Sequence, residues 1–89
     1  MIITIKGHRW ITFKNGCTLS IFNGFGSYSE NHFNYDVRNK KLIRTKNCEI
    51  AILRNNNFIT RNILGIDEDV KGYVNKKELN EVIKKIKNY

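Results

Sequence analysis

The chain has 89 residues, which is enough for one small domain but near the lower limit at which an apolar core holds a fold without metal or disulfide help. Hydrophobic residues make up 40% of it, and 16 lysines and arginines against 8 acids give a net charge of +8. No apolar run approaches the roughly 20 residues of a membrane span, and the first six residues are too short for a secretory signal. We therefore expect a soluble cytoplasmic protein with no membrane partner.

Predicted elements begin with residues 2–6, which form either a separate first strand or a continuation of the strand that follows, with Gly7 at a bulge or bend. A hairpin is predicted over 10–22, because Asn15 and Gly16 separate two alternating segments. A three-residue loop over 14–16, with Gly16 in the left-handed region, places apolar residues of the two strands opposite each other. A two-residue loop would instead place apolar residues opposite polar ones. The register with the three-residue loop collects one buried face, made of Ile11, Phe13, Cys17, Leu19 and Ile21.

Residues 23–35, here called the aromatic loop, carry glycines, amides and four aromatic rings. We expect a wide loop in which Phe25 or Phe33 fills the core and Tyr28 covers it. Its glycines could instead let backbone amides cradle a phosphate, but neither a helix start nor a lysine follows as in nucleotide-binding loops. Rings beside basic residues would also suit stacking with single-stranded RNA or DNA.

Three strands are predicted in the second half of the chain, over 41–45, 48–54 and 58–60. The near-continuous apolar run in 48–54 indicates a central strand covered on both faces. The last element is a helix with Asn75 as N-cap and Glu78 completing a capping box. One stripe of this helix is apolar and should be needed for folding: Leu79, Val82, Ile83 and Ile86. The elements together predict a single α+β domain over 1–89, an antiparallel sheet of four to five strands with one C-terminal helix packed on a face.

Residues 67–78 match the spacing of an EF-hand loop in part, with acids at positions one and three and Glu78 at twelve. Lys71 stands where an oxygen ligand is needed, and no helical pattern precedes the segment. The competing interpretation is that Gly72 turns the chain, Tyr73 and Val74 pack, and Glu78 serves the helix cap. We expect no structural calcium, although the sequence alone does not decide whether any cation binds here.

Candidate groups for catalysis or zinc binding are few: His8, His32, Cys17 and Cys48. A lone cysteine pair is more often two reduced thiols than a bridge, and both cysteines are expected to be packing residues. No nucleophile is paired with a base in the sequence pattern, and the spacing suits no zinc site. The sequence therefore predicts a protein that is not an enzyme and has no metal or cofactor.

Positive charge is concentrated in residues 37–62, which hold one acid, Glu49, and seven basic residues: Arg38, Lys40, Lys41, Arg44, Lys46, Arg54 and Arg61. Such a stretch attracts phosphate backbones or an acidic protein surface. The abundance of Lys, Asn and Ile and the absence of Pro and Gln are also what an AT-rich coding sequence produces, so composition alone remains an alternative source of the charge.

Several motifs, in this order, resemble those of small bacteriophage and prophage proteins. They are the Asn15-Gly16 hairpin, Gly24-x-Gly26-Ser27-Tyr28, the strand at 49–52, and Asp69-Val70-x-Gly72-Tyr73-Val74 before Glu78-Leu79. The resemblance supplies no site residues. It implies a setting in the host cytoplasm in which small proteins inhibit host factors or defence systems, anti-CRISPR proteins among them.

The sequence thus favours a small non-enzymatic phage-type binding protein that inhibits a host macromolecule, with a defence complex such as CRISPR-Cas as the foremost target. Its partner would be a host protein or ribonucleoprotein complex. The alternative is a module that binds single-stranded RNA or DNA through the same basic, aromatic surface. Its oligomeric state is left open. The expected contact residues are Phe25, Tyr28, His32, Tyr35, Arg38, Lys40, Lys41, Arg44, Lys46, Arg54 and Arg61.

Overall fold

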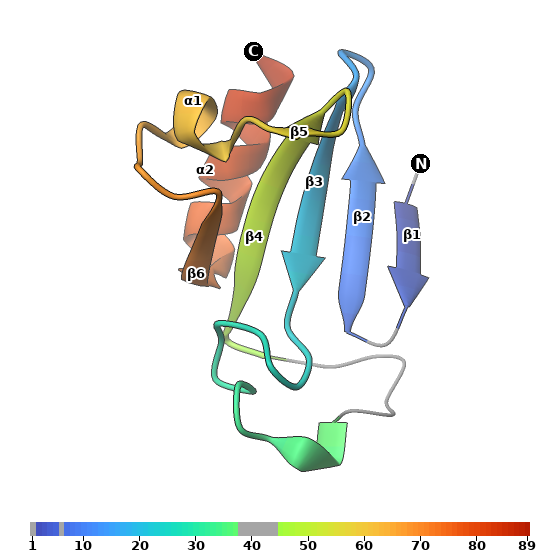
Figure 1. The fold of residues 1–89 in the computed structure, drawn as a ribbon, viewed down its shortest axis with the longest axis vertical. Coiled ribbons are helices and arrows are strands. Elements are labelled where there is room, and N and C mark those ends of the chain that lie inside the picture. The colour runs from blue at the N-terminus through green and yellow to red at the C-terminus, as the bar shows by residue number, and fades with distance from the viewer. Residues whose placement is uncertain (1, 6, 38–44) are drawn as a thin grey trace.

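The structure is a computed structural model that describes residues 2–5, 7–37 and 45–89. Six antiparallel strands and two helices form the described fold, with a short 3-10 turn, η1, at Tyr35–Val37. The predicted α+β class, with an antiparallel sheet and a C-terminal helix on one face, is confirmed (Figure 1). The elements are β1 (Ile2–Ile5), β2 (His8–Thr12), β3 (Cys17–Phe22), β4 (Asn47–Arg54), β5 (Asn57–Phe58), α1 (Thr60–Leu64), β6 (Val70–Asn75) and α2 (Lys76–Lys87).

Strands β1 to β4 are neighbours in chain order, and both β5 and β6 pair with β4. Because β3 occupies one edge of β4 from Glu49 to Arg54, β5 and β6 lie end to end along its other edge. The six strands therefore fill five positions in the sheet. The strand predicted over 41–45 falls, as far as residue 44, outside the described residues.

The hairpin between β2 and β3 has the predicted register. Ile11 pairs with Leu19, and the Phe13 amide donates to the Cys17 carbonyl at 2.8 Å, which closes a loop over 14–16. Gly16 has a φ of +86°, the left-handed conformation that glycine adopts without steric cost. Asn15 supports the turn, because its Oδ1 accepts from the Cys17 amide at 3.1 Å while its Nδ2 donates to the Ile86 carbonyl at 2.7 Å. The turn is thereby tied to the last turn of α2.

Helix α2 begins and packs as the sequence predicts. Asn75 and Glu78 form the reciprocal capping box, with the Glu78 amide donating to Asn75 Oδ1 at 2.9 Å. Val82 and Ile86 are buried against the sheet, and Leu79 and Ile83 are half-buried beside them. The sheet side of this core is Cys17, Leu19, Ile21, Cys48, Ile50, Ile52 and Val74.

The edge beyond β4 differs from the prediction. The strand expected over 58–60 is only the two-residue β5, and Thr60 instead begins α1, which the sequence did not indicate. Thr60 is fully buried, and its Oγ1 accepts from the Ile52 amide at 2.9 Å and donates to the Ile52 carbonyl at 3.4 Å. The Thr60 hydroxyl therefore takes the place of a neighbouring strand in bonding the Ile52 backbone. The chain can leave the sheet here without leaving buried backbone groups unbonded.

Strand β6 occupies much of residues 67–78, the segment whose spacing partly matches an EF-hand loop. Its pairing runs from Cys48 with Val74 to Ile50 with Lys71, so β6 uses one residue more than β4 and contains a β-bulge. The expectation that Gly72 turns the chain and Tyr73 packs is wrong: Gly72 lies within the strand, and Tyr73 is 59% exposed with a φ of +53°. Val74 is buried, as predicted.

Both helices contribute side chains to the core on one side of the sheet. On the other side, β2 and β3 carry an aromatic stack in which the His8 ring lies 3.8 Å from Trp10 and 5.2 Å from Phe22 between ring centroids. His8 Nε2 is 2.6 Å from Ser20 Oγ. The sequence predicts that both faces of β4 are covered. On this second face the covering is partial, because Ala51 is buried whereas Leu53 is only half-buried. Neither helix of the described chain has the length and apolar character that crossing a bilayer demands.

Replacing Ile86 by Ala should lower the free energy of unfolding by about 2 to 5 kcal/mol, because the substitution leaves a cavity where a fully buried side chain stood. Lys85→Ala, one residue away on the exposed face, is the matched control and should change stability by less than about 0.5 kcal/mol. Urea unfolding of both variants measures the difference. Equal midpoints would show that α2 does not complete the core.

Stability should depend on the titration of His8. Burial lowers the pKa of its imidazole below the usual 6.5, and the nearby Glu49 carboxylate opposes part of that shift. A lowered pKa means that the folded state prefers neutral His8, so its contribution is present above about pH 6.5 and is lost as the pH falls through the folded-state pKa. His8→Gln should therefore lose less stability than the wild type between pH 8 and pH 5, measured by urea unfolding. The difference in the free energy of unfolding between the two proteins at pH 8 reports the packing change alone. If the two curves of unfolding free energy against pH ran parallel, they would contradict the prediction.

Candidate functional site

The aromatic loop is held together by a buried polar core. Ser27 and Ser29 are 0% and 2% exposed, and their hydroxyls lie 2.6 Å apart. Ser27 Oγ also donates to the Gly24 carbonyl at 2.7 Å, and Ser29 Oγ accepts from the Asn31 amide at 3.1 Å. Asn31 Nδ2 then donates to the Asn23 carbonyl at 2.9 Å, closing the loop on its own first residue. These bonds satisfy groups that would otherwise be buried without partners.

The expectation that Phe25 or Phe33 fills the core is wrong. Phe25 is 41% exposed and Phe33 is 88% exposed. Small hydroxyl and amide side chains occupy the interior because the loop turns too tightly to enclose a ring, and only they can bond its many free backbone groups. The rings are consequently left on the outside.

Side chains from β4 fasten the loop to the sheet. Glu49 Oε1 accepts from the Tyr28 amide at 3.0 Å, and Asn47 Oδ1 accepts from the Glu30 amide at 2.7 Å. The loop also touches β6, since the Tyr73 amide donates to the Tyr28 carbonyl at 2.8 Å. Figure 1 shows the loop below the lower ends of β3 and β4, as a continuation of the sheet.

Gly72 permits the close approach of loop and strand. An ideal Cβ at this position would lie 2.7 Å from Tyr28 Cβ and 3.2 Å from the Tyr28 carbonyl oxygen. Any larger residue would push the loop outward, so glycine is needed for contact rather than for a turn. This contact cannot be predicted from the local sequence, because the two residues are 44 positions apart.

The predicted contact residues of the loop do come together. Phe25 and Tyr35 meet edge to face with centroids 5.1 Å apart, and Tyr28 stacks on His32 at 5.7 Å. His32 Nδ1 lies 2.9 Å from the Ser27 carbonyl, which can only accept, so this nitrogen carries the proton and donates. The His32 ring, fixed in this way, also meets Phe33 edge to face at 4.4 Å.

Two of the three predicted basic contacts that the structure describes lie apart from the rings. Of the described ones, only Lys46 adjoins the loop, where its amide donates to Glu30 Oε1 at 2.6 Å. Arg54 ends β4, about 23 Å from the start of that eight-residue strand, with its guanidinium 6.0 Å from the Tyr89 ring centroid. Arg61 pairs with Asp69 at 3.2 Å on the same distant end. The other predicted residues, Arg38, Lys40, Lys41 and Arg44, lie outside the described residues.

Tyr73 is a surface residue that the sequence reasoning assigned to packing. The β-bulge in β6 puts it in the left-handed conformation and leaves its ring 59% exposed, next to the backbone of Tyr28. The exposed rings on and beside the loop therefore number five: Phe25, Tyr28, Phe33, Tyr35 and Tyr73. Nothing in the local sequence marks the bulge, which arises from pairing with β4.

The groups considered for chemistry are placed as structural residues. Cys17 and Cys48 are buried, and burial raises the pKa of the Cys48 thiol to about 11, so it stays neutral and poorly nucleophilic. Glu78, the proposed twelfth position of the calcium loop, caps α2 and pairs with Lys71 at 3.2 Å. Across residues 2–5, 7–37 and 45–89, no three His, Cys, Asp or Glu side chains cluster as metal ligands would.

Comparison of the chain with protein-family models, with curated proteins and with solved structures finds no match in any of the three.

Gly72→Ala should destabilise the protein by about 1 to 3 kcal/mol, because its Cβ collides with Tyr28. The double variant with Tyr28→Gly removes the Tyr28 Cβ, the closest of the colliding atoms, so the penalty of Gly72→Ala should shrink by at least about 0.5 kcal/mol in that background. A double-mutant cycle from urea unfolding measures this coupling. Additive effects would show that the loop does not rest on β6.

Proposed function

We propose that the chain is a non-enzymatic binding protein whose aromatic loop docks on a partner protein and blocks it. The observation that carries the proposal is the exposure of five rings on and beside a loop whose backbone is fixed by buried hydrogen bonds. Exposed tyrosine and phenylalanine side chains are typical of the energetic centres of protein interfaces. A clustered apolar patch of this kind is uncommon on a monomer that binds nothing.

Rigidity supports the same proposal. A loop that is already ordered loses little conformational entropy when it binds, so more of the contact energy appears as affinity. The backbone of Tyr28 is bonded to both the Glu49 carboxylate and the Tyr73 amide, and its ring stacks on His32. The resemblance to phage proteins suggests a host defence complex, such as CRISPR-Cas, as the class of partner.

Single-stranded nucleic acid remains the second candidate, favoured by the net charge of +8 and by Lys46 next to the loop. Two features weigh against it. Tyr28 already has one face turned to His32, and Phe25 and Tyr35 are engaged edge to face with each other, which leaves less free stacking surface. Of the arginines predicted as contacts, the two that the structure describes, Arg54 and Arg61, lie at the far end of β4.

Replacing Tyr28 and Phe33 together by Ala should weaken partner capture from a nuclease-treated host lysate at least about 30-fold, the effect of losing roughly 2 kcal/mol of contact energy. The fold should survive, because alanine keeps the Tyr28 Cβ and backbone bonds and Phe33 is almost fully exposed. Tyr89→Ala is the control, since this ring is also exposed, at 54%, but lies near Arg54.

The alternative is tested by fluorescence anisotropy with random single-stranded RNA and DNA. We expect only weak binding that disappears near physiological salt. Micromolar or tighter binding there, lost in the Tyr28 and Phe33 variant but not in Tyr89→Ala, would replace the protein-partner proposal by the nucleic-acid one.

A further inference from the structure

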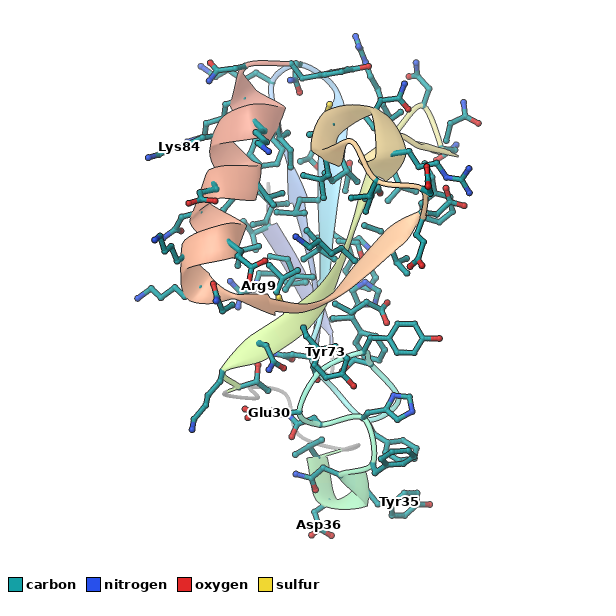
Figure 2. The ribbon with its side chains drawn as sticks, turned by 90° about the vertical axis from the view of Figure 1, so that its left-hand side faces the viewer. Arg9, Glu30, Tyr35, Asp36, Tyr73 and Lys84 are labelled. Atoms are coloured by element: carbon teal, nitrogen blue, oxygen red, sulfur yellow. The ribbon has the colours of Figure 1, made fainter. Side chains whose placement is uncertain are left out.

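A pocket of about 460 Å³ lies on the helix side of the sheet, and none of the loop's four rings lines it. It is bounded by β2, β3, β4, the end of β6 and the first turn of α2, together with Asn23 at the start of the loop and residues 45 and 46 before β4. Its volume is within the range of roughly 300 to 1,000 Å³ that small-molecule sites occupy. Arg9 reaches it from β2, because Arg9 pairs with Ile21 and so points to the side of the sheet that carries the core. Figure 2 shows Arg9 next to the junction of β6 and α2.

The charged side chains that line this pocket, among the described residues, are all positive: Arg9, Lys46 and Lys76. The nearby carboxylates have other partners, since Glu78 pairs with Lys71 and Glu30 accepts from the Lys46 backbone. In the described part of the chain the ion pairs are Arg61 with Asp69 and Lys71 with Glu78, so the three pocket cations are unpaired.

The pocket's remaining groups suit an anion that carries an apolar body. Its apolar wall comes from Ile21, Val74 and Leu79. The Cys48 thiol also lines it and, with a pKa raised by burial to about 11, adds no negative charge near neutral pH. Asn75 already caps the helix by accepting from the Glu78 amide, so the side-chain cations supply the attraction.

We propose that this pocket binds a small organic anion, with a carboxylate or phosphate group among Arg9, Lys46 and Lys76 and an apolar body against Ile21, Val74 and Leu79. Charge-assisted hydrogen bonds from a guanidinium and two ammonium groups are the stronger class of hydrogen bond and would hold the anionic group. The three apolar side chains give the ligand a second point of contact that a bare ion lacks.

The test is an NMR titration of the amide spectrum with octanoate and octyl phosphate, and with acetate and inorganic phosphate as matched anions without the apolar body. At least one octyl ligand should shift the amides of Asn47 and Asn75 saturably and bind at least about tenfold more tightly than its short counterpart, as burial of several CH₂ groups implies. Which octyl ligand binds identifies the anionic group.

Arg9→Gln, and separately Lys46→Gln, should weaken this binding about tenfold, the effect of one charge-assisted hydrogen bond. Lys85→Gln removes the same charge from the exposed face of α2 outside the pocket, and should change the affinity less than about twofold, since only screened long-range attraction is lost. Dispersed amide spectra confirm that each variant is folded.

Unsaturable shifts, equal affinities for octyl and short anions, or equal losses in Lys46→Gln and Lys85→Gln would overturn the proposal. The proposed partner-binding function does not depend on the outcome, because the Tyr28 and Phe33 variant leaves this pocket unaltered.

Discussion

Pairing of β4 along both of its edges is the constraint that positions the rest of the molecule. One edge binds β3, and the other is shared by β6, the Thr60 hydroxyl and β5. Its side chains then divide the structure: Ile50 and Ile52 enter the core beneath α2, whereas Asn47 and Glu49 bind the backbone of the aromatic loop. Core and loop therefore belong to one cooperative unit, so opening β4 would disorder the candidate site together with the fold.

The aromatic loop reverses the usual distribution of side chains, with serine and asparagine inside and rings outside. In the core of a domain this would be unfavourable, because burying hydroxyls gains little and exposing rings forgoes the hydrophobic effect. It is tolerated here since the interior hydroxyls are bonded to one another and to the backbone. Exposing the rings gives up stability in the free protein, and in the proposed complex the partner would restore it by covering them.

The sequence predicts this fold well wherever the deciding interactions are local. The hairpin register follows from Gly16 three residues beyond Phe13, and the start of α2 from Asn75 and Glu78 in one turn. Prediction fails where distant pairing decides the structure. Residues 70–75 form a strand because β4 has a free edge, and the bulge that turns Tyr73 outward is set by that pairing. The composition of residues 23–35 was sufficient to single the loop out as a candidate. Its scaffold could not be predicted, because hydrogen bonds from Ser27 and Asn31 depend on a backbone path that composition does not specify.

Lys46 adjoins the aromatic loop, but Arg54 and Arg61 lie at the far end of β4, and Lys84 of α2 and Tyr35 of the loop stand at opposite corners of Figure 2. A single-strand binding surface needs both aromatic and cationic groups along one path, because phosphates and bases alternate within a few ångströms. A protein interface has no such requirement: its rings supply short-range contact energy, while charge elsewhere raises the rate of encounter with an acidic partner through the long-range field. Separation of rings and cations therefore weighs against binding of single-stranded nucleic acid, but it does not weigh against binding of a protein partner. It also leaves the cations around Arg9 free to serve a ligand of their own.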